Sequence, residues 1–145
     1  MTPEAAALNY LQKHHVISLA TQGPLGLWAA AVFYASERFD LYFLSAGQTR
    51  HAQNLAANPF VAATIQEDYH DWPAIQGIQL EGETLQLTGA AQAAAVTVYQ
   101  EKYPFIAADP ILQAAFTRVN WYRLRPLKLY FVDNSRGFAH RDQII

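Results

Sequence analysis

The sequence contains no cysteine and few charges, and these shortages exclude several classes of protein. Among the 145 residues there is no cysteine, so disulfides, thiolate catalysis and cysteine-based zinc sites are excluded. Charged residues make up only 15% of the chain, whereas an average domain has roughly a quarter. The net charge is −2 and no run of lysine or arginine occurs, so nothing indicates a nucleic-acid-binding surface. With so few charges, we expect a partner subunit to cover part of the apolar surface.

Long hydrophobic runs are also missing. No apolar segment approaches the length of about 20 residues that a membrane helix needs. The first residues, MTPEAAALNYLQ, are amphipathic and lack the basic start and the apolar centre of a signal peptide. We therefore expect a cytoplasmic protein with no membrane partner. Neither repeats nor a linker interrupt the chain, so we expect one domain over residues 1–145.

The pattern of apolar residues predicts a mainly β protein with short helices. Alternation and β-branched or aromatic residues indicate about six strands, over 16–21, 27–35, 39–45, 60–66, 75–87 and 119–132. Capping residues, prolines and alanine-rich stretches predict short helices over about 3–14, 48–57, 90–103 and 109–116. Regular alternation of strands and helices is missing, so a doubly wound parallel sheet is not expected. This order favours an α+β fold built on a closed or nearly closed antiparallel barrel.

Two of the predicted strands contain residues that disturb regular pairing. Gly77 and Gly82 lie within the strand expected over 75–87, and glycine inside a strand often marks a bulge or a close backbone approach. Pro126 lies within the last strand, where it indicates an edge or a bulge because it has no N–H to donate. We expect the sheet to bend at these positions.

The most informative segment joins the strand that ends at Ser45 to the helix that follows it. A tight turn with Gly47 leads to a helix start that carries Thr49, Arg50 and His51. The first N–H groups of a helix lack partners and its dipole is positive there, so this end suits an anion. Arg50 adds a planar fork that matches phosphate oxygens, and the hydroxyl of Thr49 can cap or donate. The alternative is a capped surface helix whose basic residues are simply solvated.

Other candidate chemistry is thin. The five histidines are too scattered along the chain to form a recognisable metal motif, and the polar segment 67–73 has the composition of a solvated loop. No His–Asp pair that could serve Ser45 is evident, so a hydrolase triad is not supported. We therefore expect no metal site and identify no catalytic residue.

Four motifs in order along the chain resemble the pyridoxamine 5′-phosphate oxidase-like proteins. They are Ser45 with Thr49-Arg50-His51, then Asn58-Pro59-Phe60-Val61-Ala62, then Gly77-Ile78-Gln79-Leu80-Glu81-Gly82, and finally Trp121-Tyr122-Arg123-Leu124-Arg125-Pro126. Together they cover roughly residues 5 to 140. The chain is most similar to small, functionally uncharacterised members of that family. The resemblance implies a split antiparallel β-barrel that binds FMN and works as a homodimer with the FMN sites at the interface.

The resemblance also implies roles for individual residues. Ser45, Thr49, Arg50 and His51 would hold the FMN phosphate. The ribityl chain and the ring would lie beside Leu44 and the strand residues Ala30, Ala31, Val32 and Phe33, although the small residues of that strand also fit ordinary barrel packing. Gln79 would approach the flavin, and Phe138 would cap it from the partner chain.

The chain departs from true pyridoxamine-phosphate oxidases at positions that matter for their substrate. By spacing, Ala29 and Tyr34 stand where those enzymes carry an arginine and a lysine that help hold the phosphate. The tail places Arg136 and His140 too far apart for the Arg-x-His pair that binds the substrate phosphate in those enzymes. We therefore do not expect vitamin B6 to be the substrate.

The sequence leads us to expect an FMN-binding flavoprotein, an oxidoreductase acting on an unknown small molecule. Two alternatives from other classes stay open. One is a flavin binder or sensor without turnover. The other is a member of the same fold that binds haem, through His51, His70 or His140, or that binds a deazaflavin.

Overall fold

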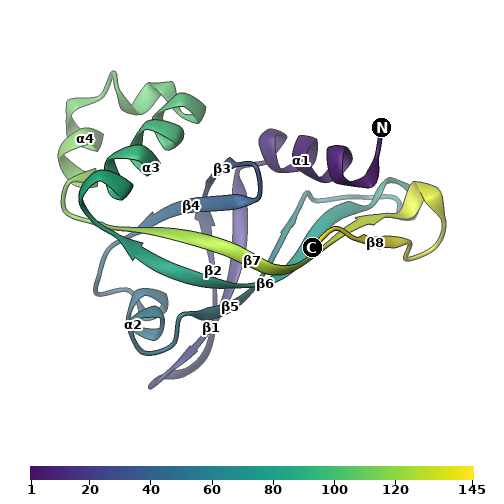
Figure 1. Cartoon of the computed structure of the whole chain (residues 1–145), viewed down its shortest axis with the longest axis horizontal. Helices are drawn as coiled ribbons and strands as arrows, with labels where there is room; N and C mark the ends of the chain where they lie inside the picture. The colour runs from purple at the N-terminus through teal and green to yellow at the C-terminus, as the bar shows by residue number, and fades with distance from the viewer.

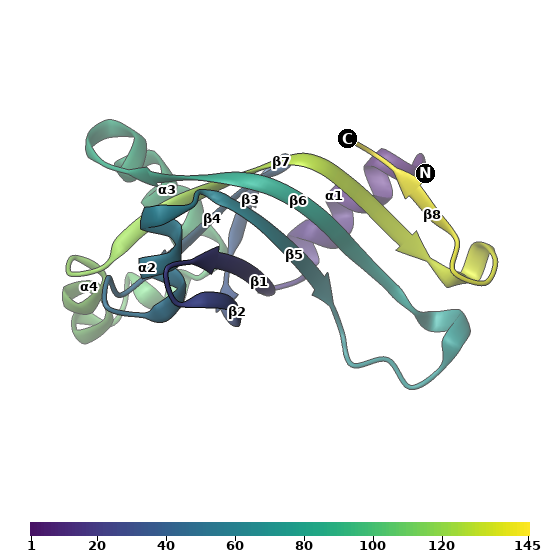
Figure 2. The ribbon, with the colours of Figure 1, turned by 90° about the horizontal axis from the view of Figure 1, so that it is seen from below.

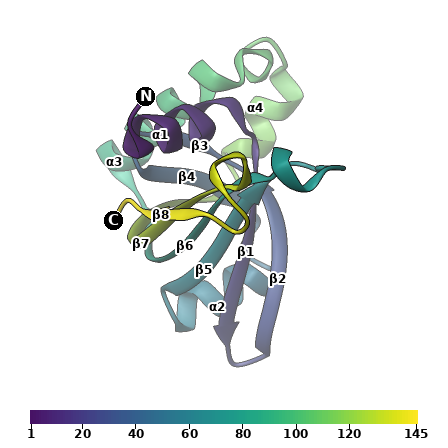
Figure 3. The same cartoon turned by 90° about the vertical axis from the view of Figure 1, so that its right-hand side faces the viewer.

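The computed structural model describes residues 1–145, and one strongly curled antiparallel sheet forms its centre (Figure 1). Seven strands follow one another in the order β2-β1-β5-β6-β7-β4-β3, and β8 pairs with the free side of β7. Figure 3 shows how the sheet curls, with β1 and β2 turned away from the layer of β4 and β7. The strands are β1 (Val16–Gly23), β2 (Gly26–Phe33), β3 (Ala35–Glu37), β4 (Asp40–Ser45), β5 (Phe60–Gln66), β6 (Gln76–Leu87), β7 (Asn120–Asp133) and β8 (Arg141–Gln143).

This architecture confirms the predicted mainly β split barrel with short helices. The six predicted strands correspond to β1, β2, β4, β5, β6 and β7. The strands β3 and β8, which have three residues each, were not predicted from the sequence. Residues 36–38 were predicted to form a turn, whereas Ser36 pairs with Leu41 and the chain reverses only after Glu37. Strands this short carry too few residues for an alternating pattern to be visible.

Four helices cover parts of the sheet. They are α1 (Pro3–Lys13), α2 (Arg50–Ala57), α3 (Gly89–Lys102) and α4 (Pro110–Phe116), with 3-10 turns at Trp72–Ala74, Pro104–Ile106 and Asn134–Arg136. Side-chain caps start three of them: the backbone N–H of Ala5 donates to Thr2, that of Ala52 to Thr49 and those of Ile111 and Leu112 to Asp109. None of the four combines the length and the apolar character that crossing a bilayer requires.

The two longest strands, β6 and β7, pair antiparallel along the length of the molecule (Figure 2). Its register shifts between Glu81 and Gly82, opposite Pro126, so the predicted bulge is confirmed. A Cβ on Gly82 would lie 2.6 Å from the carbonyl oxygen of Arg125. Only glycine therefore lets the two strands approach so closely at the bend.

Apolar side chains gather in two clusters on opposite faces of the curled sheet. The larger cluster fills the inside of the curl beneath α1 and includes Leu11, Leu41 and Phe131. The smaller one joins α3 to the outer face of β4 and β7 and centres on Tyr99 and Trp121, whose rings meet edge to face at 5.3 Å. β2 lies at the edge of the sheet, outside both clusters, and most of its residues are exposed.

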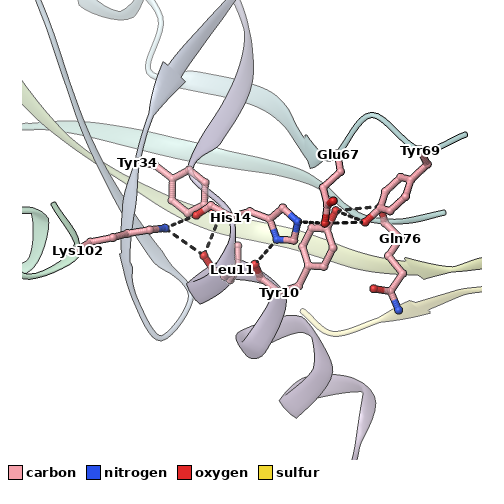
Figure 4. A network of polar contacts seen from close by, with 8 residues as sticks. All are labelled: Tyr10, Leu11, His14, Tyr34, Glu67, Tyr69, Gln76 and Lys102. Carbon is pink, nitrogen blue, oxygen red and sulfur yellow. Dashed lines mark hydrogen bonds and ion pairs between the residues drawn. The ribbon is translucent and has the colours of Figure 1, made fainter. Parts of the chain in front are cut away.

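A polar network fixes α1 to the sheet (Figure 4). The ammonium of Lys102 donates to the carbonyl oxygens of Leu11 and His14 at the C-terminal end of α1, and it lies 4.2 Å above the ring of Tyr34. Burial lowers the pKa of Lys102 to about 8. On the other side of α1, His14 pairs with Glu67 at 2.6 Å. These contacts join α1 to α3 and to the loop after β5.

Candidate functional site

The end of β4 and the start of α2 bring three polar side chains together. Ser45 is the last residue of β4, and Thr49 is the residue that caps α2. The Ser45 hydroxyl lies 3.0 Å from the Thr49 hydroxyl and 2.5 Å from Nε2 of His51, and the Thr49 hydroxyl lies 3.4 Å from the same nitrogen. We call Ser45, Thr49, Arg50 and His51 the anchor cluster.

The local sequence explains why the cluster forms. Thr49 donates to the carbonyl oxygen of Ala46 at 2.9 Å and accepts from the N–H of Ala52 at 3.3 Å, so it closes the turn and starts the helix. Because the helix starts at Arg50, the side chain of His51 turns back toward the end of β4. His51 is buried there, with only 9% of its surface exposed. The predicted helix start at Gln48 was therefore two residues early, because Gln48 belongs to the turn.

His51 shares a short hydrogen bond with Ser45. Burial lowers the pKa of its imidazole, and burial is the one cause that acts on it, so the ring is neutral near pH 7. A neutral ring carries a proton on one of its two nitrogens, so the tautomer decides whether Nε2 accepts the hydrogen bond from the Ser45 hydroxyl or donates it. No His–Asp pair for Ser45 was evident in the sequence, and the structure pairs Ser45 with His51 alone. No carboxylate orients this histidine, so the pair does not complete a hydrolase triad.

Arg50 is the member of the anchor cluster that reaches the turn between β1 and β2. Its Nη2 donates to the carbonyl oxygens of Leu25 and, at 3.3 Å, of Leu27. Its guanidinium also lies 4.4 Å above the ring of Trp28. The buried Nε has no hydrogen-bond partner. Arg50 thus holds the hairpin and still carries an unused donor, which is uncommon for a buried polar atom.

Asn54 fixes the same hairpin onto α2 and was missed by the sequence analysis. Its amide donates to the hydroxyl of Thr21 and to the carbonyl oxygen of Gly26, both at 3.1 Å. A Cβ on Gly23 would lie 2.5 Å from Oδ1 of Asn54, so the helix and the strand pack without room for a side chain. A polar residue one turn after His51 was the available signal.

The predicted ring-binding residues lie on two separate strands. Ala30 and Val32 are half-buried on β2, whereas Ala31 and Phe33 are exposed, and this strand is an edge of the sheet. Leu44 is half-buried on β4 and packs against the smaller apolar cluster beside α3. β2 therefore offers exposed backbone and small side chains next to the anchor cluster.

Gln79 and Phe138 lie far from the anchor cluster within one chain. Gln79 is exposed on β6 and accepts from the guanidinium of Arg141 at 3.3 Å. Phe138 is 81% exposed and packs against the ring of Trp72 at 5.3 Å. Figure 1 shows α2 and the turn that leads into β8 at opposite ends of the molecule. Arg141 and Trp72 were missed because each meets its neighbour only through the fold.

The anchor cluster receives no charge from Ala29 and Tyr34, which stand where the true oxidases carry an arginine and a lysine. Ala29 is exposed on β2. Tyr34 is fully buried, and its hydroxyl donates to the carbonyl oxygen of Leu11 at 2.8 Å, on the α1 side of the sheet. Arg50 is therefore the cation that the anchor cluster contributes.

The donor set of the cluster fits a phosphate group. It combines two hydroxyls, a ring nitrogen, an unpaired guanidinium N–H and the first backbone N–H groups of a helix. Charge-assisted bonds and helix N-termini are the groups that recognise phosphate oxygens in proteins. The candidate haem ligands differ: His51 is engaged with Ser45, His140 lies 3.1 Å from Asp142, and His70 is exposed.

Comparisons with known proteins agree with this fold. The chain is similar to a UPF0306 protein of Enterobacter sp. strain 638, with 32% identity over 139 residues that cover 94% of this chain and 92% of that protein. Among solved structures, the haem storage protein HutZ from Vibrio cholerae superposes with a TM-score of 0.73 at 19% identity, covering 89% of this chain and 94% of HutZ. A FAD-binding protein from Mesorhizobium loti has a TM-score of 0.67 at 13% identity, with 86% and 88% covered.

The family assignment depends on a direct match of the sequence. Residues 1–133 match the family described as pyridoxamine 5′-phosphate oxidase, and this match spans every strand of the barrel except β8. The likeness to HutZ and to the FAD-binding protein is at low identity and supports the fold alone. The chain therefore belongs to the pyridoxamine 5′-phosphate oxidase family.

Proposed function

We propose that this protein is an FMN-binding flavoprotein whose anchor cluster holds the phosphate of the cofactor. The observation that carries this proposal is the convergence of Ser45, Thr49 and His51 within 3.4 Å of one another at the start of α2. Arg50 adds the charge that a phosphate dianion needs, and its Nε has no partner in the protein. Neither α2 nor the strands β1 and β2 against which it packs contain an acidic residue that would oppose an anion.

The proposed activity is an oxidoreductase reaction on a small molecule. A bound flavin supplies hydride or electron transfer, while the protein binds it, orients it and controls access. The anchor cluster would hold the phosphate end. The exposed backbone of β2 from Ala30 to Phe33 would offer hydrogen bonds to the flavin edge, since an edge strand has unpaired N–H and C=O groups.

We further propose that the working unit is a homodimer. Leu27, Phe60 and Leu127 are each at least half exposed and line a groove of about 390 Å³ on the outer face of β1, β5 and β6. Apolar side chains gathered on a sheet face indicate an interface. Gln79 pairs with Tyr130, ten positions along β7 from the partner of Ser45, and Phe138 packs on Trp72 beyond the end of β7. Both would therefore join the anchor cluster of a second copy.

Haem binding on the same fold is the second candidate. The structural likeness to HutZ, a haem storage protein, favours it. Haem would need a free histidine nitrogen as a ligand, and His70 is the most exposed of the three candidates. Haem and FMN make different demands on the anchor cluster, because only FMN brings a phosphate monoester.

A titration with three ligands tests the proposal. Purified protein is titrated with FMN, riboflavin and haemin, and binding is followed by flavin fluorescence and by the Soret band. FMN should bind with one molecule per subunit and more tightly than riboflavin, which lacks the phosphate. Tight haemin binding that His70→Ala abolishes, together with no response to FMN, would replace the flavin proposal with the haem function.

A further inference from the structure

Nε2 of His51 and the hydroxyl of Ser45 lie 2.5 Å apart and share one hydrogen bond. In the tautomer that carries its proton at Nδ1, Nε2 of the neutral ring accepts this bond from the hydroxyl. In this state Nε2 cannot donate to an anion, and the hydroxyl proton of Ser45 points at the ring. A phosphate oxygen that enters the cluster accepts hydrogen bonds and donates none. The contact between Ser45 and His51 must therefore change before both can serve the anion.

The surroundings of His51 contain little that would oppose a change of its charge. Neither β1 nor β2, against which α2 packs, contains a charged residue. The acid of β4 is Asp40, at the far end of the strand, where it pairs with Arg125 at 3.2 Å. The nearest residue of β7 is the neutral Asn120, opposite Ser45. Arg50 is the one cation on α2, and its guanidinium is directed to the β1–β2 turn.

We propose that His51 takes up one proton from solvent at Nε2 when a phosphate monoester dianion binds, and thereby selects that form of the ligand. This inference rests on the proposed function. The protonated Nε2 donates to a phosphate oxygen, and the hydroxyl of Ser45, released from the ring, donates to another. Thr49 keeps its bond to Ala46 and holds the turn in place. The site then prefers FMN to riboflavin, which has no phosphate, and to FAD, whose phosphates are esterified on both sides.

The proposal predicts that the affinity for FMN falls as pH rises. Burial keeps the pKa of His51 low in the free protein, and a bound dianion favours the charged ring. Between these two pKa values the complex holds one more proton than the free protein, so affinity falls as pH rises. The second pKa of a phosphate monoester is about 6. At a pH of about 6.5 roughly three quarters of the ligand is already the dianion, and its remaining ionisation would raise affinity with pH. A fall in affinity as pH rises therefore comes from the protein.

Calorimetry in two buffers measures the proton directly. FMN is titrated into the protein at several pH values between about 6.5 and 8.5, each in two buffers of different ionisation enthalpy. We expect uptake of up to one proton and a Kd that rises by as much as tenfold per pH unit. Riboflavin should show neither effect. His51→Gln, which keeps a donor and an acceptor but does not titrate, should bind FMN more weakly and without proton uptake.

The outcomes separate this inference from the proposed function. FMN binding with no proton uptake, or with equal uptake in His51→Gln, would overturn the role of His51 and leave the flavin site standing. No FMN binding at any pH would overturn the proposed function itself. If His51→Gln does not fold, Ser45→Ala serves instead: it removes the hydroxyl but keeps the ring, so proton uptake should persist while affinity falls.

Discussion

Replacing Arg50 by alanine tests the anchor cluster most directly, because this side chain has two separable tasks. It would hold the phosphate, and it fixes the β1–β2 turn through the carbonyl oxygens of Leu25 and Leu27 and through the ring of Trp28. A hydrogen bond to a charged group contributes about 1.5–3 kcal/mol. Loss of that bond should weaken FMN binding about ten- to hundredfold, at about 1.4 kcal/mol per decade.

The same substitution should also cost some stability. The bonds to the turn run from a charged donor to neutral carbonyl oxygens at a partly exposed position, and the contact with Trp28 adds about 0.5–1 kcal/mol at such a site. We expect the free energy of unfolding to fall by about 1–2 kcal/mol in total. The domain should stay folded, because the amide of Asn54 still binds Thr21 and Gly26.

Fluorescence titration with FMN and urea denaturation measure the two effects separately. Arg118→Ala is the matched control, because it removes the same charge from an exposed position outside the anchor cluster. Arg50→Lys keeps the charge but loses the planar fork, and its affinity should lie between those of the wild type and Arg50→Ala. If Arg50→Ala loses stability but binds FMN as tightly as Arg118→Ala, the phosphate does not bind at this cluster and the reasoning fails.

Three further predictions concern the scaffold. Gly82→Ala should lower the free energy of unfolding by about 1–3 kcal/mol, because the added Cβ would lie 2.6 Å from the carbonyl oxygen of Arg125. Urea denaturation measures this change, and unchanged stability would contradict the bulge geometry. The pKa of Lys102 is lowered to about 8, so the unfolded chain binds more protons between that pH and about 10.4. Relative to Lys102→Met, the wild type should therefore gain melting temperature across this range, and parallel curves would refute the burial effect. Thr49→Ala should destabilise the protein by about 1 kcal/mol through the lost cap of α2 and should weaken FMN binding, whereas Thr97→Ala, at an exposed position of α3, should do neither.

The sequence by itself determined the strands, helix starts and bulge that depend only on residues a few positions apart in the chain. Alternation predicted the long strands, and Thr2 and Asp109 marked two helix starts because capping needs only the next two or three N–H groups. Thr49 was recognised as a possible cap, but its helix was predicted to start one residue before it, at Gln48. Gly82 and Pro126 predicted the bulge separately, each from its own backbone restriction. The strands β3 and β8 were not predictable in this way, since three residues carry no pattern.

The tertiary structure decided which of the predicted site residues meet. Sequence placed Ser45 and His51 near each other, but their hydrogen bond exists only because α2 starts at Arg50 and turns the ring back toward β4. Arg50 reaches Leu25 across 25 positions because β1 and β2 pack on α2. Gln79 pairs with Tyr130 of β7, ten positions from Asn120, which pairs with Ser45, and so it stays away from the cluster within its own chain. Local propensity acts over a few residues, whereas the order and curl of the strands set distances between segments that are far apart in sequence.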